Sequence, residues 1–237
     1  MNRLSLWAVE GIGEVRPGDQ VGEIVAAACR EAPNGPLLDG DVLVVTQKIV
    51  SKAEGRLVAV DPDDPLSHKG LVEAEAVRVL RRRGDLVITQ TRHGFVCANS
   101  GVDLSNVERG QAALLPVDSD RSARRVRDIV QARLGVEVGV IVSDTFGRPW
   151  RKGLTDVAIG VAGVAGVVDL RGTEDALGRT MQVTEVAVAD ELAAAAELVM
   201  GKSTGVPVAV ARGVEPAWLR DSAMAELVRP AHEDLFR

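Results

Sequence analysis

Apolar residues gather in short runs along this chain, and several of these runs predict β-strands. Asp41–Thr46 and Val138–Val142 are nearly continuous apolar stretches, which is typical of strands buried on both faces. Asp85–Thr91 and Gly94–Ala98 have the composition of paired strands joined by a tight turn. The other predicted strands are Ser5–Val9 and Val206–Ala211.

Apolar positions three and four residues apart predict four helices. Asp19 is the predicted cap of the first, and Ser119 or Asp120 that of the third. The first has its apolar face at Val21, Ile24, Val25 and Ala28, and the third at Val126, Ile129, Val130 and Leu134. The helices are expected from Asp19 to a break at Pro33–Pro36, over Ser67–Arg83, from Ser119 to Leu134, and over Thr184–Met200.

Strands and helices are interspersed, and no linker, repeat or low-complexity tract separates them. We therefore expect a mixed α+β fold that forms one domain over residues 1–237, with room for two interleaved lobes. Thr155–Val168 is rich in Gly and Ala, which predicts a close approach between backbones there.

Composition argues against several functional classes. The net charge of −6 does not suit general nucleic-acid binding, and with no Tyr and only three Trp and three Phe there is no aromatic stacking platform. Cys29 and Cys97 lie far apart, so neither a disulfide framework nor a zinc site is indicated. Because no segment approaches ~18 uninterrupted apolar residues and the start lacks a cleavage site, we expect a cytoplasmic protein without a membrane partner.

Candidate chemistry follows the strand at Val138–Val142. Ser143, Asp144 and Thr145 come next, and after a predicted turn at Gly147 there are three cations. These cations are Arg148, Arg151 and Lys152. Hard oxygen ligands beside phosphate-attracting cations suggest a metal-assisted reaction on a phosphorylated anion. The alternatives are an ordinary turn at the strand end and a solvated basic face.

Two further segments carry candidate ligands. Asn99–Asn106 offers a carboxylate and two amides suited to magnesium, manganese or calcium, although the same residues make ordinary Asx turns. Lys48 and Lys52 share a face whether the chain is helical or extended and could grip phosphates. Two surface lysines are the alternative.

Gly201–Thr204 looks like the end of a P-loop, but the required first glycine is replaced by Ala196 and the segment follows a predicted helix. It is therefore not a Walker A motif, although free amides and Lys202 could still touch a phosphate. The three histidines are isolated, which disfavours a histidine-based triad or zincin.

Six segments, taken together and in order, resemble the coenzyme F420-0:L-glutamate ligases, the gamma-glutamyl ligases of deazaflavin biosynthesis. The match covers nearly the whole chain. The segments are Val9–Gly11, Gly40–Val45 with Ser51–Gly55, Asn99–Asn106, Ser143–Arg148, Ala158–Gly163 and Met200–Gly205.

The resemblance implies a gamma-glutamyl ligase-type fold and GTP-dependent amide ligation. It also implies two divalent cations, Mg²⁺ or Mn²⁺, and a potassium ion. Asp103 and Asp144 are the implied metal ligands, with Thr145 beside the second ion. The implied GTP contacts are Ile12, Gly13, Glu14, Val15, Gln47, Lys48, Lys52, Asn106, Met200, Gly201, Lys202, Ser203, Thr204 and Gly205.

The resemblance implies that the γ-phosphoryl group of GTP activates the deazaflavin carboxylate as an acyl phosphate, which the L-glutamate amine then attacks. Such chemistry depends on positioned charges. Arg148, Arg151 and Lys152 are our expected contacts to the anionic substrate, and the general base stays open. The resemblance further implies a homodimer. Some relatives carry a C-terminal nitroreductase-like domain, which is not among these 237 residues, so the expectation is either a free-standing ligase or the ligase half of such a protein. A nucleotide- or flavin-binding module and a non-ligating phosphotransferase are the alternatives.

Overall fold

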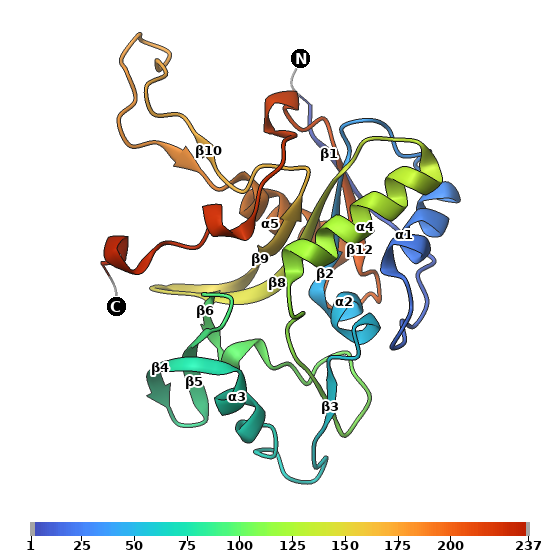
Figure 1. The fold of residues 1–237 in the computed structure, drawn as a ribbon, viewed down its shortest axis with the longest axis vertical. Coiled ribbons are helices and arrows are strands. Elements are labelled where there is room, and N and C mark those ends of the chain that lie inside the picture. Colours follow the sequence, from blue (N-terminus) through green and yellow to red (C-terminus); the bar gives the residue numbers. More distant parts are fainter. Residues whose placement is uncertain (1–2, 236–237) are drawn as a thin grey trace.

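The centre of the computed structural model, which describes residues 3–235, is a five-stranded mixed sheet (Figure 1). Its strands lie in the order β1-β12-β2-β8-β9. The pair β2 and β8 is parallel, whereas the other neighbouring pairs are antiparallel. The strands are β1 (Ser5–Ala8), β2 (Val42–Thr46), β8 (Gly139–Arg148), β9 (Arg151–Ala162) and β12 (Val208–Arg212).

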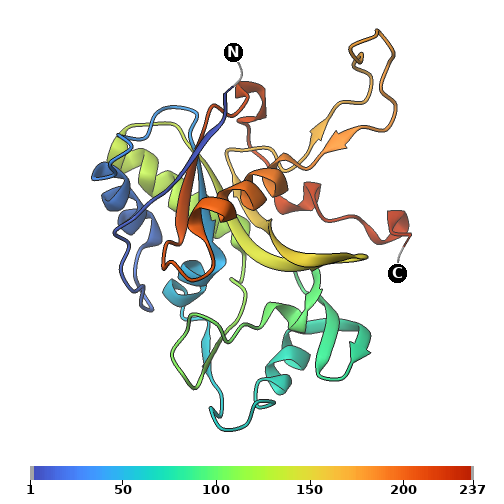
Figure 2. The ribbon, with the colours of Figure 1, turned by 180° about the vertical axis from the view of Figure 1, so that it is seen from behind.

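Helices cover both faces of this sheet. α1 (Val21–Arg30) and α4 (Ser119–Leu134) pack together on the face that is in front in Figure 1. α5 (Val188–Met200) covers the opposite face, which Figure 2 turns toward the reader. Gly22 allows α1 to approach α4 closely, since a Cβ there would lie 2.7 Å from the Cβ of Ile129.

The chain between β2 and α4 forms a smaller part beside the main sheet. α2 follows β2 without a loop, and two small antiparallel sheets, β3-β7 and β4-β5-β6, follow it. The β8–β9 hairpin contacts β6 and lies above this part in Figure 1. The elements are α2 (Gln47–Ala53), β3 (Leu57–Ala59), α3 (Lys69–Glu75), β4 (Ala76–Arg83), β5 (Leu86–Thr91), β6 (Val96–Ala98) and β7 (Gln111–Ala113).

A two-stranded arm projects from the body between β9 and α5 (Figures 1 and 2). β10 (Val168–Asp169) and β11 (Glu185–Val186) pair at its base. Short 3-10 turns occupy Asn99–Gly101, Pro216–Trp218, Met224–Glu226 and Ala231–Glu233.

The predicted α+β class is confirmed, and the predicted strands are present with small shifts at their ends, except that β8 continues well beyond its predicted end. The continuous apolar runs became β2 and β8, whose residues Val42–Val45 and Val140–Val142 are all fully buried. Burial on both faces explains why these two strands lack polar alternation.

The predicted helix over Ser67–Arg83 is wrong in its second half. α3 ends at Glu75, and Ala76–Arg83 forms β4, which pairs antiparallel with β5. Gly84, with a φ of +58°, lies in the turn between the two strands. The apolar residues of Ala76–Arg83 fit the spacing of a helix as well as that of a strand, so the pattern alone does not choose between them. Pairing with β5 made the segment a strand.

The strand expected to end near Asp144 continues to Arg148. β8 and β9 pair from Val140↔Ala162 to Arg148↔Arg151, so the turn lies at Pro149–Trp150 and not at Gly147. Pairing with β9 gives the backbone of these polar residues hydrogen-bond partners, which a local pattern cannot anticipate.

The predicted helix caps are also wrong. Gln20 is the N-cap of α1, and the Asp19 carboxylate instead accepts a hydrogen bond from a neighbouring backbone N–H. Asp118 caps α4, because its carboxylate accepts a hydrogen bond from the Arg121 N–H at 2.9 Å.

The predicted helix over Thr184–Met200 is shorter in the structure. Glu185–Val186 pairs with β10, and α5 begins only at Val188. Among residues 3–235, no helix is long and apolar enough to cross a membrane.

The close backbone approach predicted for Thr155–Val168 is confirmed at Gly160. A Cβ on Gly160 would lie 2.4 Å from the carbonyl oxygen of Ser119, the first residue of α4. Because backbone cannot move aside as a flexible side chain can, β9 and α4 would have to separate.

We therefore expect Gly160→Ala to destabilise the protein by about 1–3 kcal/mol. Thermal or urea unfolding measures this loss. Gly70→Ala is the control, since a Cβ at Gly70 meets nothing within 4 Å and Ala suits helix α3. Equal stability of the two variants would contradict the packing argument.

Candidate functional site

A pocket of about 610 Å³ lies where the parallel strands β2 and β8 end their shared register at Thr46↔Ser143. The carboxyl ends of parallel strands are a common place for ligand sites. Five segments line the pocket: Ile12, Gly13, Glu14 and Val15; Thr46, Gln47, Lys48, Ile49 and Lys52; Asp103, Ser105, Asn106, Val107 and Glu108; Ser143, Asp144, Thr145 and Asp156; and Glu197, Met200, Gly201, Lys202, Gly205, Val206 and Pro207.

Three lysines of the pocket are each paired with a carboxylate from a distant segment. The pairs are Lys48–Asp103 (2.5 Å between Nζ and Oδ2), Lys52–Glu14 (2.5 Å between Nζ and Oε1) and Lys202–Asp156 (2.6 Å between Nζ and Oδ1). The pocket therefore carries both signs of charge, and each pair joins two segments that are distant in the sequence.

Lys48 and Lys52 project into the pocket because α2 begins directly after β2. Helical geometry puts residues four apart on one face, so the predicted shared face is confirmed. Only 13% and 10% of their side chains are exposed, so the alternative of two surface lysines is wrong.

Asp103 and Asp144 have opposite pKa shifts. Burial opposes ionisation of Asp103, but the Lys48 ammonium and local hydrogen bonds outweigh it and lower the pKa of Asp103. Burial raises the pKa of Asp144 to about 7, and a hydrogen bond from the Thr145 backbone offsets this only in part. Repulsion from Asp103 and Asp156 adds to the shift, so a cation beside Asp144 would relieve an unfavourable charge.

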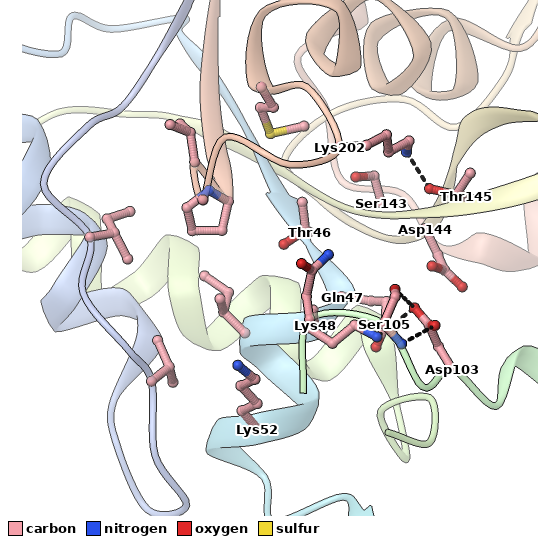
Figure 3. A pocket seen from close by; sticks show the side chains of 18 of the residues that line it. Thr46, Gln47, Lys48, Lys52, Asp103, Ser105, Ser143, Asp144, Thr145 and Lys202 are labelled. Atoms are coloured by element: carbon pink, nitrogen blue, oxygen red, sulfur yellow. Dashed lines mark hydrogen bonds and ion pairs between the residues drawn. The ribbon is translucent and has the colours of Figure 1, made fainter. Parts of the chain in front are cut away.

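The alternation of strand β8 divides the pocket's polar residues into two groups. Asp144 points toward Asp103 and Lys48 on one side of the strand, whereas Thr145 points toward Lys202 on the other (Figure 3). Successive side chains of a strand face opposite ways, which explains this division.

Gln47 presents an unsatisfied donor in the pocket wall. Its side chain is 2% exposed, and its Oε1 accepts a hydrogen bond from Ser51 Oγ at 2.7 Å. Its Nε2 has no partner among the described residues. A buried amide without an acceptor is costly, so a ligand oxygen placed here would gain a hydrogen bond.

The residues present fit a divalent cation. Asp103, Asp144 and Thr145 supply hard oxygen atoms, and Mg²⁺ is commonly bound through one or two carboxylates together with water and substrate phosphates. Over residues 3–235, no group of three or more His, Cys, Asp or Glu side chains is placed to hold a metal on its own. The phosphates of a ligand would complete such a set.

The structure brings together most of the residues that the sequence nominates. Those lining the pocket are Ile12, Gly13, Glu14, Val15, Gln47, Lys48, Lys52, Asp103, Asn106, Asp144, Thr145, Met200, Gly201, Lys202 and Gly205. Ser203 and Thr204 belong to the same loop without lining the pocket.

The three cations expected at the strand end do not line the pocket. Arg148, Arg151 and Lys152 are exposed on the β8–β9 hairpin, where Arg148 Nη2 donates to the Lys152 carbonyl oxygen at 2.7 Å. The extension of β8 carries them away from Asp144, so their contact to substrate stays a prediction.

Sequence reasoning missed three acids of the pocket, Glu108, Asp156 and Glu197. Asp156 is 3% exposed and lies opposite Thr145 in the β8–β9 register. An acid directly before the apolar run Val157–Ala162 was a usable signal, but its partner Thr145 becomes evident only once the hairpin register is known.

The strand ends of this mixed sheet gather lysines, hard carboxylate oxygens and an unsatisfied amide, which together have the chemistry to bind an anionic ligand and a cation. Comparison with known proteins identifies the class more closely. The family model described as F420-0:Gamma-glutamyl ligase matches residues 11–213.

Curated relatives agree with the family model over nearly the full chain. Proteins named coenzyme F420:L-glutamate ligase from Methanothermobacter thermautotrophicus and Methanopyrus kandleri are 43% and 41% identical, and cover 99% and 94% of both chains. The relative of the same name from Methanococcus maripaludis is 42% identical over 85% of this chain and 87% of its own. The chain is therefore a ligase. It belongs to the F420-0:Gamma-glutamyl ligase family.

Both cysteine thiols are buried, and we expect them to be unreactive in the folded protein. Burial raises the pKa of Cys97 to about 12, with a further contribution from Asp144, and raises the pKa of Cys29 to about 12. The thiolate is the reactive form, so a thiol reagent such as Ellman's reagent should label neither cysteine in the folded protein at pH 8. Both should react after unfolding in guanidinium, and rapid labelling of the folded protein would contradict the assignment.

Proposed function

We propose that this ligase joins L-glutamate to coenzyme F420-0 in a GTP-dependent reaction and then adds further gamma-glutamyl units. The observation that carries the proposal is the convergence of Lys48, Lys52, Asp103 and Asp144 in one pocket of a chain that belongs to this family. The relatives above are named coenzyme F420:L-glutamate ligase, which supports the glutamate-joining part of the proposal.

In the first step, a carboxylate oxygen of the deazaflavin attacks the γ-phosphorus of GTP and GDP leaves. The product is an acyl phosphate. Lys48 and Lys52 project toward the pocket and would neutralise charge on the phosphate oxygens, which is the main task of a protein in phosphoryl transfer. Gln47 Nε2 is a further donor for a nucleotide oxygen.

In the second step, the α-amine nitrogen of L-glutamate attacks the acyl carbon. The new C–N bond forms as phosphate departs, and the amine gives up a proton. The general base for that proton is left open.

Asp103, Asp144 and Thr145 would hold two divalent cations, Mg²⁺ or Mn²⁺, and a potassium ion is a further proposed component. When bound, such cations offset the charge that builds on phosphoryl oxygens. Lys48 forms an ion pair with Asp103 in this structure, so a cation that bound to Asp103 would release the Lys48 ammonium to contact a phosphate.

Nucleotide contacts are proposed for the segments that line the rest of the pocket. The first loop contributes Ile12, Gly13, Glu14 and Val15, and the segment before β7 contributes Asn106. Met200 at the end of α5 and Gly201, Ser203, Thr204 and Gly205 of the loop after it complete the set, whereas the Lys202 ammonium of that loop is already paired with Asp156 and Glu197.

We further propose a homodimer in the cytoplasm, with residues 1–237 acting as one ligase domain. Leu177 and Val183 on the arm are 87% and 84% exposed, and apolar side chains on a projecting arm are typical of contact surfaces.

The direct test incubates the protein with F420-0, GTP, L-glutamate and Mg²⁺ or Mn²⁺, and follows the deazaflavin by mass spectrometry. Stepwise gain of glutamyl units with GDP release supports the proposal. GDP release without mass gain would favour a non-ligating phosphotransferase. If neither glutamylated deazaflavin nor GDP forms, the ligase proposal is overturned in favour of a binding module.

Asp144→Asn should lower kcat by about a hundredfold or more, because an amide no longer neutralises a bound cation at the reacting phosphate. Asp190→Asn is the matched control. Burial also raises the pKa of Asp190, and its carboxylate accepts the Ala158 N–H at 2.9 Å, but it does not line the pocket. Near-normal ligation by the Asp144 variant would remove it from the site.

Arg151→Glu tests the basic hairpin tip. If the tip contacts the anionic deazaflavin, KM for this substrate should rise about tenfold while KM for GTP changes little. Arg124→Glu, an exposed arginine on α4, is the control for net charge. An unchanged KM for the deazaflavin would exclude the tip from substrate binding.

A further inference from the structure

We propose that Asp156 is a positioning residue that anchors the loop Met200–Gly205 and the Thr145 hydroxyl, and that Lys202 serves as the loop's internal anchor instead of a phosphate ligand. This inference rests on the proposed function only where it concerns GTP. The anchoring itself is a property of the chain alone.

Asp156 is the least exposed acid of the pocket wall that holds an ion pair. Only 4% of its side chain is exposed. Its Oδ1 accepts from Thr145 Oγ1 at 2.7 Å and from Lys202 Nζ at 2.6 Å, and its Oδ2 accepts from Ser143 Oγ at 3.2 Å. One carboxylate therefore joins β8, β9 and the loop after α5.

The donors of Lys202 are fully committed within the chain. A lysine ammonium has three N–H donors. Lys202 directs them to Asp156, to Glu197 Oε1 at 2.7 Å, and to Thr145 Oγ1. None is left for a phosphate oxygen unless one of these contacts breaks.

The charge on Lys202 is held in place by its acids. Its Nζ lies 2.6 Å from Asp156 Oδ1 and 2.7 Å from Glu197 Oε1, so a carboxylate from β9 and one from α5 both contact the ammonium. An ammonium between two carboxylates is therefore satisfied as it stands.

Asp156 also orients the Thr145 hydroxyl. The single Thr145 proton goes to Asp156, and one lone pair accepts from Lys202. One lone pair of Oγ1 stays available, so the hydroxyl can only act as an acceptor toward a cation or donor in the pocket.

The loop itself depends on such an anchor. Gly201 has a φ of +68° and Gly205 a φ of +72°, so the segment leaves α5 and enters the approach to β12 through two residues of high backbone freedom. Between them, Lys202 is tied to the sheet through β9. Backbone groups of the anchored loop would then meet the nucleotide.

The first test measures hydrogen–deuterium exchange of the ligand-free protein. Asp156→Asn keeps the side chain's shape but removes its charge, and exchange over residues 201–206 should rise at least tenfold. Asp41→Asn is the matched control. Asp41 is 1% exposed and pairs with Arg212 at 2.6 Å at the other end of the same sheet, so its loss should lower stability without loosening the loop.

The second test uses a fluorescent GTP analogue with Mg²⁺. If Lys202 is an anchor, Asp156→Asn should weaken binding about tenfold and raise KM for GTP more than KM for L-glutamate. If Lys202 is instead a phosphate ligand restrained by Asp156, the same variant would bind equally or more tightly. That result would overturn the proposal.

A double-mutant cycle completes the design. Asp156→Asn and Lys202→Met remove the same contact, so the double variant should resemble either single variant within about twofold. If Asp156→Asn does not fold, Lys202→Met still decides, because its loop should show the same faster exchange without ligand. Unchanged exchange in that variant overturns the anchor. Absence of GTP binding by the wild type would overturn the proposed function but leave the exchange result valid.

Discussion

The parallel pairing of β2 and β8 is the constraint on which the rest of the site depends. Both strands are buried on both faces, and their register ends at Thr46↔Ser143. From this point β2 turns directly into α2, whereas β8 continues as a hairpin with β9. The helix after β2 thus supplies Lys48 and Lys52, and the continued strand β8 supplies Asp144. The pocket lies at the sheet edge where β2 gives way to a helix while the adjacent strand β8 continues.

The extension of β8 has a second consequence. Because side chains alternate along a strand, Asp144 and Thr145 face opposite sides of the hairpin. Asp144 joins Asp103 and Lys48, while Thr145 joins Asp156 and Lys202. The adjacent residues Asp144 and Thr145 therefore belong to two separate polar groups, one on each side of strand β8.

Charge pairing gives the pocket its ligand-free form. Lys48, Lys52 and Lys202 each form an ion pair with a carboxylate from a segment distant in the sequence. Asp144 differs, since burial without an adequate cation raises its pKa to about 7. In the proposed reaction, an incoming cation and phosphates would exchange partners with the first two lysines, whereas Lys202 would keep the loop after α5 in place.

The sequence alone predicted six of the strands, namely β1, β2, β5, β6, β8 and β12, the helices α1, α4 and α5, and most of the candidate residues. Continuous apolar runs defined β2 and β8, and the family resemblance nominated Asp103, Asp144 and the pocket lysines. Local pattern failed at Ala76–Arg83, because a segment that fits two periodicities takes the one for which a partner strand exists.

Only the tertiary structure decided where β8 ends and, as a result, where the charged side chains next to it lie. Pairing with β9 moved Arg148 and Lys152 out to an exposed hairpin and brought Asp156 opposite Thr145. The physical reason is that strand pairing is set by hydrogen-bond partners distant in sequence. The chemistry of the residues was therefore readable from the chain, but which of them meet depended on a register that only the folded sheet defines.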